Sequence, residues 1–240
     1  MVYALDMDFQ TPLLPARLIK RYKRFLADIE LESGEIVTAH CANPGSMMGL
    51  AAPDTRVWVE PNDDPKKKLK YSWKLNEYAD GTFCVIDTSI ANRVVKEALS
   101  LGKIEELSSF SGVRPEVKYG DKSRVDFLLE DSKLGNLYLE VKSVTLSRHP
   151  KLAEFPDSVT ARGAKHLNEL SAVITQGARA ALLYVINRTD CDVVDVARDI
   201  DPTYAKSLDD AKANGVEVYA YGCDISPNGV TLANSIVLRS

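Results

Sequence analysis

The sequence predicts a mixed α/β fold in two domains: a small β-barrel over residues 1–87 and a domain of helices and strands over residues 88–240. Three observations lead to this prediction. The first part contains short runs in which apolar and polar residues alternate, separated by turn residues, which is typical of short strands. A helix signal begins at Asp87. Behind it, the unbroken apolar run at 180–186 predicts a fully buried strand.

The expected strands of the first domain are short and follow one another closely. Residues 27–31 alternate apolar and acidic side chains, and residues 36–39 return after the turn around Gly34. Three further runs lie at 56–60, 68–75 and 82–86. Five short strands in about 85 residues favour a small barrel. An OB-type barrel is one candidate, and the pattern does not separate it from other small barrels.

The second domain begins with a helix over about 88–101, in which Ile90, Val94, Ala98 and Leu101 share one face and Gly102 ends the helix. Two strands joined by a turn at 131–136 follow. The buried strand at 180–186 then lies between two further helices, and a hairpin of two strands ends the domain. In order, these remaining elements are strands at 125–130 and 137–146, helices at 160–176 and 202–213, and strands at 216–225 and 230–238.

Composition limits the classes of function. The longest apolar stretch falls far short of the ~20 residues of a membrane-spanning helix, and the N-terminus lacks a secretory signal, so we expect a cytoplasmic protein with no membrane partner. Four cysteines and three histidines are scattered without metal-ligand spacing, which argues against a zinc site. Any metal would therefore be held by carboxylates, which favour a hard cation such as Mg²⁺, or Mn²⁺.

The formal charge of −4 argues at first against a nucleic-acid partner, but the charges are segregated. Residues 142–188 hold seven Lys/Arg against three Asp/Glu, and binding to a polyanion responds to the local field. Two basic clusters in the first domain are further candidates, and each could equally be a solvated surface. Their candidate residues are Arg21 and Lys23 in one cluster, and Lys66, Lys67 and Lys68 in the other.

Aromatic residues interleave with these cations, as on barrels that bind single strands. They include Tyr22, Phe25 and Trp73, and we expect most of them to lie in the barrel core.

Two expected strands of the second domain carry charge where their neighbours predict an interior. Asp126 interrupts an apolar run, and strand alternation places Glu140 and Lys142 on the same face. If the two strands pair across the 131–136 turn, Asp126 lies beside Glu140. Two buried like charges are costly unless a cation neutralises them, so we expect Asp126 and Glu140 to hold a divalent metal. Lys142 would then assist catalysis. The alternative is a solvent-facing cross-strand ion pair.

The spacing of an Asp, thirteen intervening residues and then Glu-x-Lys resembles the PD-(D/E)XK nuclease superfamily. The proline of the motif is absent, because Val125 precedes Asp126. The resemblance implies an α/β domain with a central mixed sheet, and an acidic residue on the preceding helix that also binds the metal. Glu97 fits that role.

Longer phrases resemble the sugar fermentation stimulation protein A (SfsA) family over nearly the whole chain. They are ANPGSM at 42–47, PEVKYG at 115–120, SRVD at 123–126, LEVKSVTL at 139–146, FPDSVTARGAKHL at 155–167 and IDPTY at 200–204. The resemblance implies an N-terminal OB-fold joined to a PD-(D/E)XK nuclease-like domain, and DNA binding with little sequence preference. It also implies a regulatory link to sugar (maltose) utilisation.

Arg162, Lys165 and His166 open the 160–176 helix, where cations close to a metal suit a phosphate backbone. For Asp157 the alternatives are a residue that closes over the site and a turn residue beside Pro156, and for Asn92 they are a side chain that faces the site and one that faces the solvent.

The leading hypothesis is a DNA-binding protein, or one that also binds RNA, with a magnesium-dependent nuclease-type site that hydrolyses phosphodiester bonds. The second is a non-catalytic DNA-binding regulator on a retained nuclease scaffold. The third is a module that binds nucleotides or oligosaccharides through the barrel. A homodimer is left open.

Overall fold

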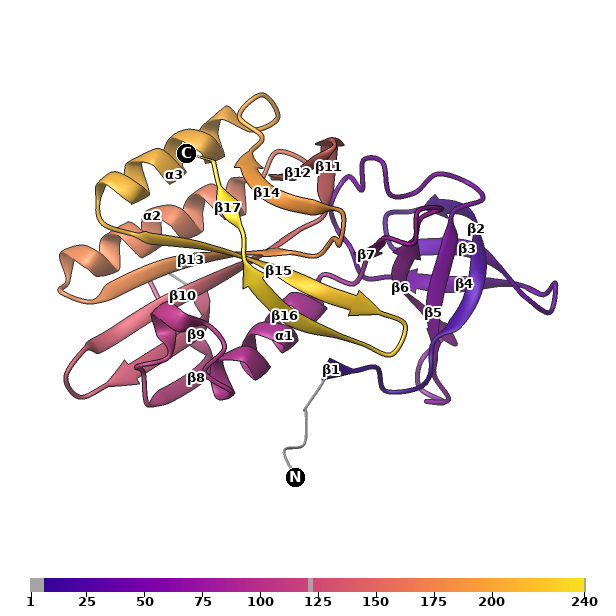
Figure 1. Ribbon diagram of the computed structural model, residues 1–240, viewed down its shortest axis with the longest axis horizontal. Coiled ribbons are helices and arrows are strands. Elements are labelled where there is room, and N and C mark those ends of the chain that lie inside the picture. Colours follow the sequence, from indigo (N-terminus) through magenta and orange to yellow (C-terminus); the bar gives the residue numbers. More distant parts are fainter. Residues whose placement is uncertain (1–6, 121–122, 240) are drawn as a thin grey trace.

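The computed structural model describes residues 7–120 and 123–239. Figure 1 shows a barrel and a larger sheet domain side by side. No helix in these described residues is long and apolar enough to cross a membrane. The barrel contains β2 (Leu14–Tyr22), β3 (Leu26–Leu31), β4 (Ile36–Cys41), β5 (Arg56–Pro61) and β6 (Tyr71–Glu77), and β7 (Phe83–Val85) pairs with the edge of β6.

The barrel closes because β4 pairs with both β3 and β6, which joins the two ends of the strand order β4-β3-β2-β5-β6. Its core is filled by buried side chains that include Trp73, Leu18 and Ile29. The prediction of a small, OB-type barrel is therefore confirmed. The set of strands differs, because β2 was not predicted and takes the place in the ring that residues 82–86 were expected to fill. A β-bulge between Leu18 and Lys20 interrupts its alternation, which explains the missed signal.

The second domain is built on a seven-stranded mixed sheet with the order β1-β16-β15-β13-β10-β9-β8. The central pairs β10–β13 and β13–β15 are parallel, and the outer pairs are antiparallel. This confirms the predicted α/β class with a central mixed sheet, and the predicted strand at 180–186 is fully buried as β13. The strands of the sheet are β1 (Met7–Asp8), β8 (Gly112–Tyr119), β9 (Ser123–Asp131), β10 (Gly135–Val144), β13 (Arg179–Ile186), β15 (Glu217–Ser226) and β16 (Gly229–Ser235).

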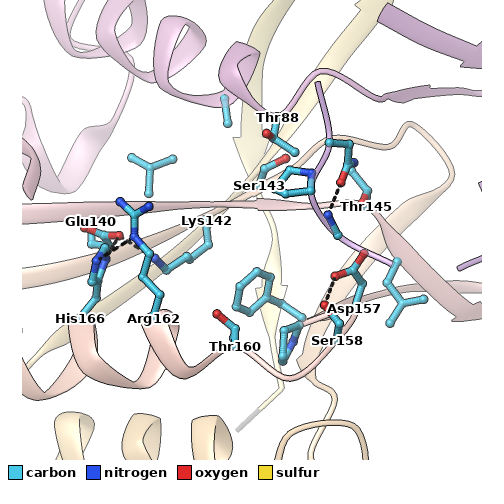
Figure 2. A pocket seen from close by; sticks show the side chains of 18 of the residues that line it. Thr88, Glu140, Lys142, Ser143, Thr145, Asp157, Ser158, Thr160, Arg162 and His166 are labelled. Atoms are coloured by element: carbon cyan, nitrogen blue, oxygen red, sulfur yellow. Dashed lines mark hydrogen bonds and ion pairs between the residues drawn. The ribbon is translucent and has the colours of Figure 1, made fainter. Parts of the chain in front are cut away.

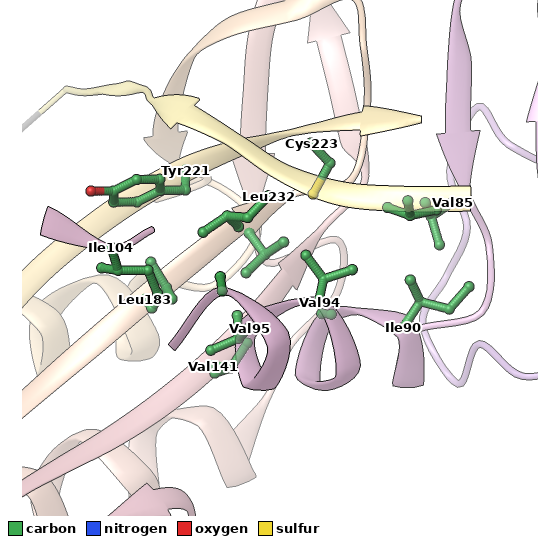
Figure 3. Packing of buried hydrophobic residues seen from close by; sticks show 14 of the residues in the cluster. Val85, Ile90, Val94, Val95, Ile104, Val141, Leu183, Tyr221, Cys223 and Leu232 are labelled. Atoms are coloured by element: carbon green, nitrogen blue, oxygen red, sulfur yellow. The ribbon is translucent and has the colours of Figure 1, made fainter. Parts of the chain in front are cut away.

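Helices cover both faces of this sheet. On one face, α1 (Ser89–Ser100) and the short helix at Glu105–Leu107 pack their apolar side chains against Val141 and Leu183, as Figure 3 shows. On the other face, α2 (Ala161–Thr175) and α3 (Pro202–Ala213) enclose a second core. The three long helices match their predicted ranges closely, since Thr160 and Asp201 accept hydrogen bonds from the first turns of α2 and α3.

A smaller sheet, which the sequence patterns did not predict, lies beside the main one. Its order is β11-β12-β14-β17. The strands are short and carry charged residues that take part in ion pairs, such as Arg148 with Glu154, so their apolar alternation is weak. Their bounds are β11 (Leu146–His149), β12 (Lys151–Phe155), β14 (Cys191–Val196) and β17 (Val237–Leu238).

A buried ion-pair cluster lies where the barrel meets α1. The Nζ atom of Lys74 is 2.6 Å from Asp87 Oδ2 and 3.2 Å from Glu60 Oε2, and all three side chains are buried. Asp87 also accepts hydrogen bonds from the backbone N–H and the hydroxyl of Ser89, in the first turn of α1. Burial acts to raise the pKa of Asp87. The charge of Lys74 and the hydrogen bonds from Lys74 and Ser89 outweigh burial, so this pKa is lowered.

Replacing Lys74 by methionine would leave Asp87 and Glu60 buried without their cation. Removing one partner of a buried pair costs about 3–5 kcal/mol, so we expect the free energy of unfolding in a urea titration to fall by about that amount. The exposed Lys70→Met is the control and should change it by less than about 0.5 kcal/mol. Equal stabilities of the two variants would contradict a structural role for the Lys74 cluster.

Candidate active site

A pocket of about 530 Å³ lies between the two domains. Its floor is formed by β10, one side by α1, and the other side by α2 and the loop that precedes it (Figure 2). The barrel contributes the loop at Asn43, Pro44 and Gly45. Residues from distant parts of the chain therefore meet here.

Asp126 lies at the point where β9 and β10 stop pairing. The two strands form the predicted antiparallel hairpin, and their register runs from Gly135 opposite Asp131 to Leu139 opposite Phe127. Beyond this point the backbone pairing ends, and the carboxylate of Asp126, in place of a backbone carbonyl oxygen of the partner strand, accepts a 2.7 Å hydrogen bond from Val141 N. Its other oxygen accepts a 2.7 Å hydrogen bond from Asn92 Nδ2 on α1. The strand pairing thus brings Asp126 next to Glu140, as the sequence predicts.

Glu140 is almost completely buried, with 3% of its surface exposed. Its Oε1 atom accepts a 2.6 Å hydrogen bond from Lys142 Nζ and lies in hydrogen-bond contact with His166 Nδ1. Because Arg162 Nε donates to His166 Nε2 at 3.3 Å, Nδ1 is the nitrogen that carries a proton toward Glu140. The second carboxylate oxygen, Oε2, is buried and has no hydrogen-bond partner within the described structure.

The two carboxylates have opposite pKa shifts. Burial, followed by the charge of Glu140, raises the pKa of Asp126 above its ordinary value. Burial also acts to raise the pKa of Glu140, but the hydrogen bond with His166 and the charge of Lys142 outweigh it, so that this pKa is lowered. The neighbours of Glu140 therefore favour its ionised form, whereas burial and the charge of Glu140 favour the protonated form of Asp126. Such a separation of neighbouring acids is common in functional sites.

Glu97 does not join these residues at the pocket. Among the described residues that line it, α1 supplies Ser89, Ala91 and Asn92. The described residues also contain no group of three His, Cys, Asp or Glu side chains placed to hold a metal ion. Asn92 instead occupies the position on α1 next to Asp126. The role of Glu97 as a third metal ligand stays a prediction.

The three residues predicted at the start of α2 lie on two adjoining pockets. Arg162 and His166 line the main pocket. With Asp126 they also line a second pocket of about 370 Å³, to which Lys165, Arg124 and Glu116 contribute. Lys165 Nζ lies 3.2 Å from Ser123 Oγ and 3.4 Å from Glu169 Oε1. The basic side chains therefore extend from the carboxylates toward the start of β9.

The candidate residues of the barrel are distributed differently. Arg21 donates hydrogen bonds to the carbonyl oxygens of Asn43 and Gly45, and so holds the loop that lines the pocket. Lys23 is exposed in the β2–β3 turn. The cluster Lys66, Lys67 and Lys68 is also exposed, in the loop between β5 and β6, and does not line the pocket. Contact of these residues with nucleic acid stays a prediction.

Asp157 joins the barrel to the second domain at the pocket. Its Oδ2 atom accepts a 3.0 Å hydrogen bond from Met47 N, and its carbonyl oxygen accepts a 2.7 Å bond from Ser46 Oγ. A Cβ atom on Gly45 would lie 2.3 Å from Asp157 Oδ2, so only glycine fits there without a shift. The sequence patterns did not predict that the barrel loop lines the site, and the run Asn43-Pro44-Gly45-Ser46 was its only signal.

Fold and site together define a two-domain protein that joins an OB-type barrel to an α/β domain with a central mixed sheet, which carries Asp126, Glu140 and Lys142. Family models described as "SfsA N-terminal OB domain" and "Sugar fermentation stimulation protein RE domain" match residues 19–86 and 89–229. The chain belongs to the sugar fermentation stimulation protein A (SfsA) family.

Named relatives agree with this assignment over their full length. A sugar fermentation stimulation protein homolog from Ruegeria sp. is 60% identical over 95% of this chain and 98% of its own. A homolog from Ruegeria pomeroyi is 59% identical over 96% of this chain and 100% of its own. The solved structure of Pyrococcus furiosus SfsA in complex with Ca²⁺ has a TM-score of 0.88 at 25% identity and covers 99% of this chain and 100% of its own.

The opposite pKa shifts give a prediction for the metal-free protein. Since the Asp126 pKa is raised, its ionised form lowers stability at pH values above that pKa, and Asp126→Asn should raise the melting temperature near neutral pH. This gain should vanish as the pH falls through the raised pKa. Because the Glu140 pKa is lowered, its ionised form stabilises the fold above the ordinary carboxyl pKa, and this contribution is lost as the pH falls through the lowered pKa.

Glu140→Gln should therefore lower the melting temperature at neutral pH, where each kcal/mol corresponds to about 2–4 °C for a chain of this size. Thermal unfolding in chelator from pH 3 to 8 measures both variants, and Asp63→Asn, on the surface, is the control. Shifts of the same sign in the two variants would refute the charge distribution described for this site.

Proposed function

We propose that this protein binds nucleic acid, DNA in the first place, and hydrolyses its phosphodiester bonds with a divalent cation, Mg²⁺ or Mn²⁺, held at Asp126 and Glu140. The observation that carries the proposal is the pair of adjacent carboxylates in a pocket that also contains a lysine, a histidine and an arginine. Family membership supports the same assignment.

The residues present fit a hard divalent cation. Carboxylate oxygens are its preferred ligands. Glu140 Oε2 is buried without a hydrogen-bond partner in the described structure, and a bound cation would supply that partner. Asp126 and Glu140 would hold the cation, and the amide nitrogen of Asn92 donates a hydrogen bond to Asp126 beside them. When bound, the cation would neutralise the two acids and polarise a phosphoryl oxygen. Pyrococcus furiosus SfsA was solved with Ca²⁺, another hard cation.

The chain's own groups would orient the reactants. In hydrolysis a water oxygen forms a bond to phosphorus, the bond from phosphorus to the leaving sugar oxygen breaks, and the protons of the water remain with the two products. Lys142 Nζ, held by Glu140 at the edge of the pocket, would position the water or stabilise the charge that develops on the phosphate. His166 fixes the orientation of the Glu140 carboxylate, and Arg162 would contact a neighbouring phosphate.

Cleavage assays on the purified protein test this proposal. We expect single- or double-stranded DNA or RNA to be cut in Mg²⁺ or Mn²⁺ and to stay intact in chelator. Glu140→Gln and Lys142→Ala should each reduce the rate by at least about 100-fold, the usual cost of a lost transition-state contact. Affinity for the uncut substrate should change less than threefold.

Matched controls remove the same chemical groups from the surface of the same hairpin. Glu130→Gln and Lys133→Ala lie on β9 and in the adjoining turn, and should leave the rate unchanged. Wild-type rates in both active-site variants would refute the site. Metal-independent binding without any cleavage would instead support the second hypothesis, a DNA-binding regulator on a nuclease scaffold.

The lysine cluster 66–68 predicts a salt effect. If it contacts phosphates, replacing all three lysines by serine should make the plot of log affinity against log salt shallower by about 2–3, because each phosphate contact contributes about 0.9. Fluorescence anisotropy of labelled duplex DNA between 50 and 200 mM salt, about the range in which such contacts are lost, measures the slope. An unchanged slope would show that the cluster is a solvated surface. Lys206→Ser with Lys212→Ser, on the exposed face of α3, is the control.

A further inference from the structure

Both domains contribute a loop to the rim of the pocket. Ser46 and Met47 of the barrel hydrogen-bond to Asp157 of the loop before α2, so the two loops meet across one side of the opening. Arg21 also fixes the barrel loop, because it donates hydrogen bonds to the carbonyl oxygens of Asn43 and Gly45. A substrate must therefore enter between loops that are tied to each other.

The carboxylates lie below this rim. Glu140 and His166 have exposed fractions of only 3% and 5%, and the side chain of Lys142 is 13% exposed. The pocket of about 530 Å³ lies within the range of roughly 300–1,000 Å³ that encloses a small ligand. Such a volume suits one strand with its bases unpaired. A flexible single strand can bend into such a recess, whereas a duplex must first be distorted or unpaired to bring a phosphate to a group below the rim.

A turn of the barrel next to this rim is suited to guide a single strand. Lys23 and Arg24 have positive φ angles of 47° and 64°, which are uncommon for residues other than glycine, and both are exposed. Phe25 follows them and is 43% exposed, although aromatic side chains are usually buried. Arg21 donates a 3.0 Å hydrogen bond to the Arg24 carbonyl oxygen as well as its bonds to the pocket loop, so turn and loop share one anchor.

We propose that the strand reaching Asp126 and Glu140 is single-stranded, and that the barrel turn Lys23-Arg24-Phe25 guides it to the pocket. Lys23 and Arg24 contact its phosphates, and a base stacks on Phe25, an interaction that does not depend on sequence. Arg162 receives the backbone on the other domain. This inference rests on the proposed function and adds its substrate class.

The first test compares a single-stranded 30-mer, its blunt duplex, and a duplex with a single-stranded overhang, all in Mg²⁺. The single strand and the overhang should be cut at least tenfold faster than the blunt duplex. Equal rates on all three would overturn the inference while leaving the proposed hydrolysis intact. Binding of the same three probes to Glu140→Gln in Ca²⁺ gives a second measurement that does not depend on cleavage.

In that binding assay the single strand should bind at least fivefold tighter than the blunt duplex. Absence of cleavage together with this preference would refute the proposed hydrolysis and support the inference on strandedness. A preference for duplex would refute the inference whether or not cleavage occurs. The two proposals can therefore fail separately.

The second test concerns the turn. Lys23→Ser, Arg24→Ser and Phe25→Ala together should weaken single-strand binding by at least fivefold, the lower end of what loss of one stacked base costs. The matched control removes the same kinds of group elsewhere on the surface: Lys206→Ser, Lys212→Ser and Ile36→Ala, in which Ile36 is 65% exposed. Equal affinities of the two triple variants would overturn the role of the turn. Melting temperatures within about 2 °C of wild type show that the comparison is between folded proteins.

Discussion

The α/β domain must hold two like-charged carboxylates, Asp126 and Glu140, side by side, although Glu140 has almost no contact with water. The rest of the domain meets the requirements that this pair sets. Asp126 takes hydrogen bonds from Val141 N and from Asn92 on α1, and Glu140 contacts Lys142 and His166. These contacts come from three elements, β10, α1 and α2, so all three must be in place together with β9, which carries Asp126. A purely structural core has no need of such an arrangement, because apolar residues of similar volume are usually as stabilising.

The barrel takes part in the same site. Its loop lines the pocket, and both Asp157 and Arg21 hold that loop through hydrogen bonds. The buried Lys74–Asp87 pair fastens the barrel to the start of α1, which also carries Asn92. The relation between the domains therefore follows from specific polar contacts at the pocket and at its base, and a change in one domain is expected to alter the geometry available to a substrate in the other.

Much of the framework could be predicted from sequence because its signals are local. Apolar spacing and terminal glycines predict the α1 and α2 helices. The length and the flanking residues of the 180–186 run predict a buried strand. Asp126, Glu140 and Lys142 could be placed together because a hairpin turn between two strands fixes which residues face each other. By contrast, β2 was missed because a bulge shifts its alternation, and the smaller sheet was missed because its strands are short and charged.

What the sequence by itself determined is the class of the three long helices and of most strands in the main sheet, the α/β order, and the one pair of strands whose side chains create the charged site. These features depend on residues that are close together in the chain. Only the tertiary structure decided that Asn92 of α1 donates a hydrogen bond to Asp126, that Arg21 anchors a loop, and that Gly45 and Asp157 meet at the rim. At the same rim, the hydrogen bond from Ser46 to Asp157 joins residues 111 positions apart. The relative position of such residues is set by how sheets, helices and barrel pack, and no local pattern of residue types records it.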